Sequence, residues 1–456
     1  MSNRIRAGLR AGAAAAALCA AGLWGAYTVA QTAAEQAFAQ AVERLRAALP
    51  PEVVLEHGAV TADPVSGRIT VADVAFGPRN DPQERLRAPL MVLEGLRSQG
   101  GGLGSLSADS LVLTVTERGA AHQLMTLGSL RVAGLTLPEA GQPFDPAAIT
   151  VDSAEAAGFV LTPANPTEDP SGRIGRIALA GIGGDRPDRL DIEGVDLRLP
   201  ELMVGDRLAL ARLSAENIRL LPLLLTLAAG DTPPLPQATA RLSLEGLAVT
   251  QGDAPIFRLA RFASETEAVG GNRDRLRGSL SAEGFDLAVP PEIGPFTLGY
   301  ARIQAALAFG FEVDLAAGDV NLPQFRLALQ EVGALEIAGR MTGLAADPMR
   351  DGRLHGFTLR YTDAGLVARA LEEGAKQSGM RAEELRQQIG EMSPMLFSGP
   401  NAGPNVQALR GFLANPTSLT VTAAPPAPVA LSDLEREGGR TPDGAARLLN
   451  ITVTSP

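Results

Sequence analysis

The sequence predicts a mainly β protein: an N-terminal transmembrane helix and a short helical stalk, then an elongated, repeated antiparallel β-sheet, and finally a small α+β cap at the C-terminus. Three observations predict this fold class. An uncharged apolar stretch follows a basic N-terminus, a short phrase of alternating apolar and polar residues recurs along most of the chain, and helical periodicity replaces it after Asp363. A period of two marks a half-buried strand, and its recurrence marks a repeat architecture.

The N-terminal residues predict export across a membrane. Residues 1–10 form a basic leader with three arginines, and residues 11–30 are apolar over about the length that a helix needs to span a bilayer. Because positive charge stays inside, we expect a single pass through a bacterial inner membrane with the bulk of the chain in the periplasm. The segment is either a retained anchor or a signal peptide cleaved after Thr28–Ala30.

Residues 31–51 have the spacing of an amphipathic helix. Ala34, Phe38 and Leu45 share one face of it, and two prolines end it at Pro51. We expect this helix to form a stalk that docks on the first strands.

The β region, residues 52–362, repeats one phrase. Leu190–Pro200 and Leu280–Pro290 are its clearest copies: apolar alternation, an acidic residue, a small residue, alternation again and a closing proline. Gly, Asn and Asp reach left-handed backbone angles at least cost, and Gly inside a strand marks a bulge or a close approach of two chains. We expect the strands to bend at these small residues. They are Asp73, Ser110, Gly134, Gly158, Gly194, Asn217, Gly246, Gly284, Asp319 and Gly356.

Two architectures fit this repeat. Strands that all bend alike would build a coiled or trough-like sheet, whereas ordinary hinges between strands would suit a large sandwich. Successive small residues lie about 24 or about 36 residues apart, which leaves room for two or three strands. The acidic residues one place before the bend, or three places in the case of Glu155, are expected to face solvent and to blunt edge pairing. They are Asp109, Glu155, Glu193, Glu216, Glu245 and Glu283.

Residues 363–456 form the predicted α+β cap. Asp363 is placed to cap a helix that begins near Leu366, and Ser378–Gly379 ends that helix. The spacing predicts a second helix with Leu385 and Ile389 inward. This second helix spans residues 381–391, and the further elements expected are a third helix over 406–413 and strands over Ser418–Ala423 and Asn450–Thr454. Terminal caps of this kind are common in repeat proteins.

The composition argues against several classes of function. A net charge of −11 disfavours nucleic-acid binding, since phosphate contacts need a basic face. Cys19 is the single cysteine, so no disulfide framework forms. The three histidines (His57, His122 and His355) do not stand at metal-ligand spacing. We recognise no hydrolase, nucleotide-binding or metalloprotease motif.

The sequence therefore predicts no catalytic residue, no metal site and no cofactor. Three aspartates, Asp185, Asp188 and Asp191, suggest a cation site at first sight. A turn at Gly183–Gly184 accounts for them more simply.

The anchor, the stalk and the recurring LxAxGLxLP strands together resemble the AsmA-like proteins of the bacterial envelope, over roughly residues 53–361. The resemblance is one of pattern, and no family motif maps residue by residue. It implies a protein that is anchored in the inner membrane, projects into the periplasm and guides lipids along an apolar β-groove.

Our leading hypothesis is a non-enzymatic, membrane-anchored periplasmic protein of envelope maintenance that binds lipid in an apolar β-groove. Its partners would be the inner membrane, lipid and envelope proteins. The alternative is a structural or protein-interaction scaffold of the cell envelope without a lipid site. A periplasmic hydrolase would need carboxylates from distant segments to converge in one pocket.

Overall fold

The structure is a computed structural model, and its described part is mainly β, with strands paired antiparallel. The chain divides into two compact units, Met1–Pro234 with Val249–Ala254, and Leu235–Ala248 with Pro255–Pro456. The described residues are 38–39, 52–63, 66–97, 102–117, 120–136, 150–165, 169–183, 188–200, 205–218, 238–271, 274–289, 299–441 and 443–456.

The predicted transmembrane segment, residues 11–30, lies outside the described residues. Within the described ranges, no helix combines the length and apolar character that crossing a bilayer requires. Of the predicted stalk, the structure describes Phe38 and Ala39, and both are helical.

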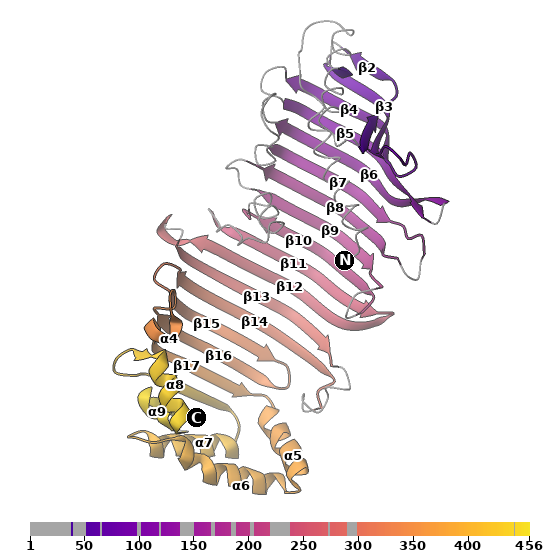
Figure 1. Ribbon diagram of the computed structural model, residues 1–456. Helices are drawn as coiled ribbons and strands as arrows, with labels where there is room; N and C mark the ends of the chain where they lie inside the picture. Colours follow the sequence, from indigo (N-terminus) through magenta and orange to yellow (C-terminus); the bar gives the residue numbers. More distant parts are fainter. Residues whose placement is uncertain are drawn as a thin grey trace. The chain divides into compact units, whose positions relative to one another are not determined.

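The first unit is an open antiparallel sheet, and no second sheet packs on it among the described residues (Figure 1). Strands β1 and β2 both pair with β3. From β3 onward the strands pair in chain order, and the last of these pairs is β9 with β10. The strands are β1 (Val53–Glu56), β2 (Val60–Asp63), β3 (Arg68–Pro78), β4 (Leu86–Arg97), β5 (Gly102–Glu117), β6 (Ala120–Thr136), β7 (Val151–Leu161), β8 (Ser171–Ile182), β9 (Arg189–Arg198) and β10 (Arg207–Glu216).

Two rows of residues with left-handed backbone angles cross the strands of this unit. The first row occupies β3, β5, β7 and β9, with φ between 50° and 71°. The second row occupies the intervening strands β4, β6 and β8 and the residue that follows β10, with φ between 57° and 68°. The members of the first row are Asp73, Ser110, Gly158 and Gly194. The members of the second row are Gly95, Gly134, Gly181 and Asn217.

The strand register places the rows parallel to each other. On β6, Gly128 lies opposite the first-row residue Gly158, and Gly134 belongs to the second row. Positions 128 and 134 are six residues apart, a separation of about 20 Å along a strand. The irregular steps of the sequence repeat follow from this arrangement, because successive small residues belong sometimes to one row and sometimes to the other.

A left-handed conformation is found at eight of the ten predicted positions, seven of them inside strands and the eighth, Asn217, one residue past the end of β10. Asp319 lacks a positive φ, and Gly356 has a φ of 158°, near the extended region. In the first unit these residues do not make bulges, since the register continues unchanged past Gly158 and Gly194. They allow close approach instead: a Cβ on Gly194 would lie 3.6 Å from the Cα of Gly175. Gly284 does mark a bulge, toward β14.

Each row also shifts the apolar alternation by one residue. On β6, Leu127, Leu130 and Leu135 all pack with the same core, although simple alternation would put Leu130 on the face opposite to Leu127. The position between them, Gly128, is where the first row crosses the strand. Backbone rotation at the rows thus keeps one face of a long strand apolar throughout.

The core of the first unit lies under its N-terminal strands. Val71, Leu93 and Leu106, on β3, β4 and β5, are at most 1% exposed. Phe38 packs into the same cluster and meets the ring of His57 edge to face. In the described part of the stalk, the helix therefore docks on the first strands, as the sequence predicts.

The second unit is again an open antiparallel sheet, whose strands pair in chain order from β12 to β18 and then with β20. Strand β17 also pairs with β19. The unit boundary passes through β11, after Ala248, and through β12, after its first residue Ala254. The strands are β11 (Ala240–Gln251), β12 (Ala254–Ala268), β13 (Arg275–Ala288), β14 (Arg302–Asp314), β15 (Asp319–Leu329), β16 (Gly333–Thr342), β17 (Arg353–Asp363), β18 (Ser418–Ala423), β19 (Val429–Ala430) and β20 (Ile451–Thr454).

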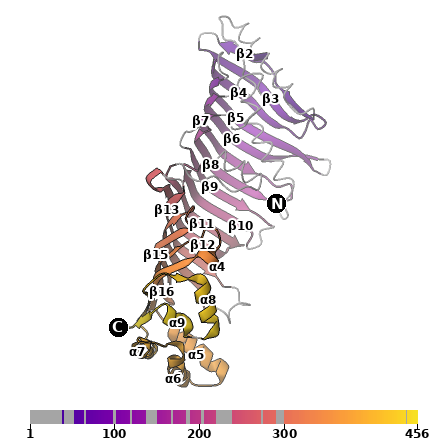
Figure 2. The same cartoon turned by 60° about the vertical axis from the view of Figure 1, so that its left-hand side comes forward.

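Helices gather beside β17 and the strands that follow it (Figure 2). Asp363 accepts hydrogen bonds from the backbone N–H groups of Gly365 and Val367 and so caps α5, as predicted. The sequence did not predict α8 and α9. The helical segments are η2 (Val269–Gly271), α4 (Pro348–Asp351), α5 (Leu366–Ser378), α6 (Ala382–Met392), η4 (Ser393–Leu396), α7 (Ala402–Ala414), α8 (Leu431–Arg440) and α9 (Gly444–Leu448).

The predicted cap elements are largely present. The strand expected over Ser418–Ala423 is β18, and the strand expected at the C-terminus is β20. Leu385 does point inward, since its Cδ2 atom lies 3.0 Å from where a Cβ on Gly374 of α5 would be. The inward placement of Ile389 is wrong: it is 37% exposed, because α6 extends beyond the contact with α5.

Helix α7 covers the last strand of the sheet. Asn405, which is 2% exposed, donates to the Ile451 carbonyl and accepts from the Val453 N–H. These backbone groups lie on the side of β20 that faces away from β18, so Asn405 satisfies an edge that is otherwise open to pairing. Phe412 of α7 meets Tyr361 of β17 edge to face.

Candidate functional site

One face of the second unit is apolar from strand to strand. Residues that lie directly opposite each other on paired strands point to the same face. One such row of partners crosses the sheet from β13 to β20 and is apolar at every step. It consists of Leu280, Phe309, Phe325, Ile337, Leu359, Val421 and Val453.

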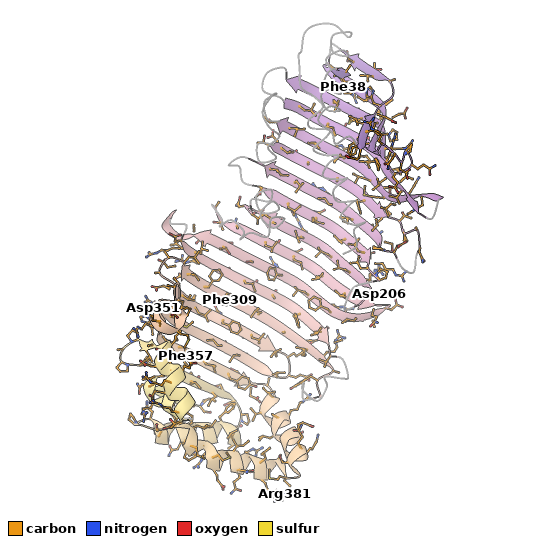
Figure 3. The ribbon with its side chains drawn as sticks, in the orientation of Figure 1. Phe38, Asp206, Phe309, Asp351, Phe357 and Arg381 are labelled. Atoms are coloured by element: carbon orange, nitrogen blue, oxygen red, sulfur yellow. The ribbon has the colours of Figure 1, made fainter. Side chains whose placement is uncertain are left out.

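Five of the fourteen phenylalanines gather on this face, on β12 to β15. We call them the phenylalanine patch. None of the five is buried, although three contacts join their rings at centroid distances of 5.3 to 6.3 Å. Phe309 is labelled in Figure 3. The patch comprises Phe257, Phe285, Phe309, Phe311 and Phe325.

A glycine makes room for one ring of the patch. A Cβ on Gly278 would lie 2.4 Å from the Phe311 ring, so the ring rests on the bare backbone of the neighbouring strand. This contact fixes Phe311 against the sheet and leaves its outer side to solvent.

The apolar face is covered at one end. Helices α7, α8 and α9 pack on β18 to β20, where Leu434, Leu448 and Phe357 surround a buried cluster of Ala423, Val429 and Leu449. Strands β13 to β15 pack against their neighbouring strands, and no helix of the described part covers them to a comparable extent. The phenylalanine patch is therefore an uncovered apolar surface in the described structure.

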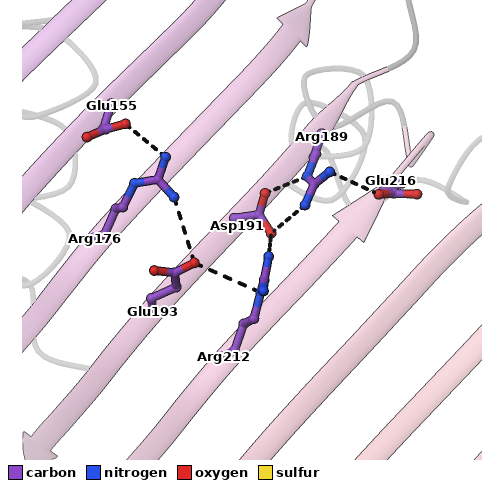
Figure 4. Close-up of polar contacts among 7 residues, drawn as sticks. All are labelled: Glu155, Arg176, Arg189, Asp191, Glu193, Arg212 and Glu216. Carbon is purple, nitrogen blue, oxygen red and sulfur yellow. Dashed lines mark hydrogen bonds and ion pairs between the residues drawn. The ribbon is translucent and has the colours of Figure 1, made fainter.

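In the first unit, the face opposite that unit's own apolar core carries a network of ion pairs across β7 to β10, which we call the ion-pair ladder (Figure 4). Arg176 on β8 reaches Glu155 on β7 at 2.9 Å and Glu193 on β9 at 3.7 Å. Arg212 on β10 joins Glu193 to Asp191, and Arg189 joins Asp191 to Glu216.

Asp191 is the buried centre of the ladder. Its side chain is 9% exposed, and both oxygens accept hydrogen bonds, from Arg189 and from Arg212. The hydrogen bond from Arg189 is the main cause that holds the pKa of Asp191 well below its usual range; burial opposes this effect, and Arg212 and Ser214 reinforce it. Asp191 thus remains ionised at neutral pH and has no role as a general acid.

A shallow depression of about 650 Å³ lies beside the ladder on β5 to β9. Small residues form its floor: Ser105, Ala133, Ser153 and Ala180 are successive cross-strand partners. Arginines and carboxylates surround them, and the residues lining the depression include no histidine, lysine or cysteine. Its ionisable side chains are Arg131, Glu155, Arg176, Arg189 and Asp191.

The three histidines lie far from one another along the chain and in separate surroundings. The ring of His57 lies beside Phe38 and the Gly58 carbonyl, His122 is the partner of Val115 on β5, and His355 is 3.0 Å from Thr342. Within the described ranges, no three His, Cys, Asp or Glu residues are grouped so that they would hold a metal ion. Asp188 is buried, Asp191 belongs to the ladder, and Cys19 and Asp185 lie outside the described residues.

Three of the six acidic residues near the bends face solvent as expected, since Asp109, Glu245 and Glu283 are exposed, and the other three have a different role. Glu155, Glu193 and Glu216 form ion pairs with arginines, mostly across neighbouring strands in the interior of the sheet, so they do not act at an edge. Sequence reasoning missed the arginines. Their signal was present, since Arg176 and Arg212 stand directly opposite Glu193, but it requires the register of β8, β9 and β10.

Comparison with known proteins identifies one similarity. Residues 313–456, from the end of β14 through the cap, match a family model described as "Uncharacterized protein". No curated protein and no solved structure matches the chain significantly. The matched segment is about a third of the chain, so this match does not assign the whole chain to a family.

Proposed function

We propose that this protein binds lipid acyl chains on the apolar face of the second unit and acts in the bacterial envelope as a non-enzymatic lipid-handling protein. The uncovered phenylalanine patch is the observation that carries this proposal. Contiguous exposed apolar surfaces of this kind mark binding sites in soluble proteins. The function is the one that the resemblance to AsmA-like proteins implies.

The chemistry of the face fits an acyl chain better than a polar ligand. The cross-strand partners from Leu280 to Val453 offer no hydrogen-bonding side chain, so a bound molecule gains mainly by removal of apolar surface from water. The rings of Phe309 and Phe325 meet edge to face, so the face is an uneven apolar surface. A flexible hydrocarbon chain adapts to such a surface.

The location of the protein is part of the proposal. The basic leader and the apolar segment of residues 11–30 support a single inner-membrane pass with the sheets in the periplasm. Protease added to cells with a permeabilised outer membrane should then degrade the chain. Resistance until the inner membrane is dissolved would contradict this orientation.

Binding of a fluorescent phospholipid to the purified full chain tests the lipid site. Phe309→Asp places a charge in the patch and should weaken binding by about 10- to 100-fold, the equivalent of about 1.5 to 3 kcal/mol of lost apolar contact. Ala306→Asp is the matched control, because Ala306 lies on the same strand, three residues away, and points to the opposite face.

The two variants should differ strongly if the patch holds the lipid. Equal affinity in Phe309→Asp, Ala306→Asp and the parent chain would refute the assignment, as would the absence of any lipid in native mass spectra of protein purified gently from membranes. Circular dichroism of each variant establishes that the sheet is intact.

A further inference from the structure

A second uncovered apolar surface lies on the cap helices. Four large side chains at the end of α6 and in η4 are between 37% and 66% exposed. We call them the methionine patch. They are Ile389, Met392, Met395 and Leu396. In the described chain, the other exposed large apolar side chains are scattered along the sequence, whereas these four lie within eight residues of one another.

The patch is the unused half of a helix stripe. Leu385, Ile389, Met392 and Leu396 follow one another at helical spacing and share a face. At its start the stripe packs against α5, where Leu385 contacts Gly374. The flank beside it packs on α7, since Arg410 donates to the Gly390 carbonyl and Ser393 is fully buried. Beyond the end of the α5 contact, the side chains of the same stripe are between 37% and 54% exposed.

The charges around the patch distinguish between occupants. Residues 366–396 contain four basic and five acidic side chains. Each basic one has a partner: Arg369 lies over the Tyr300 ring, and the other three pair with glutamates. Glu391, next to the patch, accepts from the Gln387 amide and from none of these cations. Anionic bilayers bind helices that carry an excess of Lys and Arg, which this segment lacks.

We propose that the methionine patch is a docking surface for a helix of a partner protein, which extends the packing that α5 makes with the first half of the stripe. The partner helix carries an apolar stripe with basic residues at its flank, complementary to the exposed carboxylate of Glu391. Methionine suits such a surface, because its flexible side chain adapts to a partner's shape. A second copy of this acidic chain would bring carboxylates together and is a poorer fit. The surface does not depend on lipid binding.

Photo-crosslinking in the native host tests this surface. The probe is benzoylphenylalanine, introduced into the full-length chain in place of Met395, with Gln387 as the control position. Gln387 is exposed on the same helix but points away from the patch. We expect a protein adduct from position 395 whose cross-linked residues form the apolar stripe of a basic helix. Its yield should be about tenfold lower at position 387 and in a Met392→Glu background, equivalent to the burial of about one methionine side chain.

Four outcomes would overturn the proposal: adducts of lipid alone, an adduct with the mass of two copies of this chain, equal yields at both positions, or no adduct. Circular dichroism of the Met392→Glu chain shows whether the cap remains folded. Glu391→Gln provides a second readout, since it should reduce the yield while leaving the apolar stripe unchanged.

Discussion

Strands β3 to β5 and strands β13 to β15 carry similar alternations of apolar and polar residues, yet one set is buried and the other is open. Val71, Leu93 and Leu106 are at most 1% exposed. Phe309 and Phe325, at comparable positions in their strands, are only partly covered. Alternation therefore specifies a strand with one apolar face, and it carries no information on whether anything packs against that face.

The two regions also differ in what stabilises them. The first strands gain from a packed cluster that includes Phe38. Strands β7 to β10 have few fully buried side chains, and the ion-pair ladder joins their polar face. Because exposed ion pairs each contribute between about 0 and 1 kcal/mol, the ladder is a weak substitute for a core, and its buried member Asp191 is the most important link.

Truncation of one leucine in each region should give the largest contrast. Leu93→Ala removes a side chain with no exposure and should lower the free energy of unfolding by about 3 kcal/mol or more, since it leaves a cavity. Leu327→Ala, on the open face beside Phe325, should cost about 1 kcal/mol, because its site is already partly in water. Urea titration of the full chain, followed by circular dichroism, measures both.

Similar losses at the two positions would break the comparison. They would mean that the open face is covered in solution. Addition of phospholipid should then change the loss in free energy of unfolding more for Leu327→Ala than for Leu93→Ala.

A substitution in the first left-handed row should have an intermediate effect. Gly194 has a φ of 65°, and a Cβ would find ordinary contact distances there, so the cost of Gly194→Ala comes from the backbone conformation. We expect a loss of about 1–2 kcal/mol. Gly194→Asn should cost less, since asparagine occupies the equivalent position of the second row at Asn217. Equal costs for Ala and Asn in urea titrations would argue against a left-handed conformation.

Local features of this fold were readable from the sequence because they depend on single residues. The small residue in each phrase identified Ser110 and Gly194 as bends, and Asp363 and Gly379 identified the ends of a helix. Asp319 was a false positive, since it begins β15 and does not interrupt it. These signals act within a few neighbouring residues, where propensity and backbone geometry decide the structure.

Features that join distant segments were not readable. The two-row arrangement and the Arg176–Glu193 pair appear only when the register of the strands is known. The depression near Ser105 and Ser153 depends on the same register. Sequence reasoning placed Ile389 inside the cap because helical periodicity identifies an apolar stripe but not where the neighbouring helix ends.

The smallest expected effect is a dependence of stability on pH in the ion-pair ladder. The folded pKa of Asp191 lies below the value of about 3.9 for an unfolded chain. Its contribution is therefore present above about pH 4 and is lost as the pH falls further, because the unfolded chain then takes up a proton more readily. Asp191→Asn should be less stable than the parent by about 1 kcal/mol at pH 7, and the difference should fall toward zero near pH 2.

Urea titrations at pH 7, 4 and 2 measure this convergence, and Glu312→Gln is the matched control. Glu312 pairs with Arg277 in the second unit, but its side chain is 41% exposed, so solvent screens the pair. We expect a much smaller change for this variant. If Glu312→Gln followed the same pH profile as Asp191→Asn, burial would not be what distinguishes Asp191, and the ladder would behave as an ordinary set of surface ion pairs.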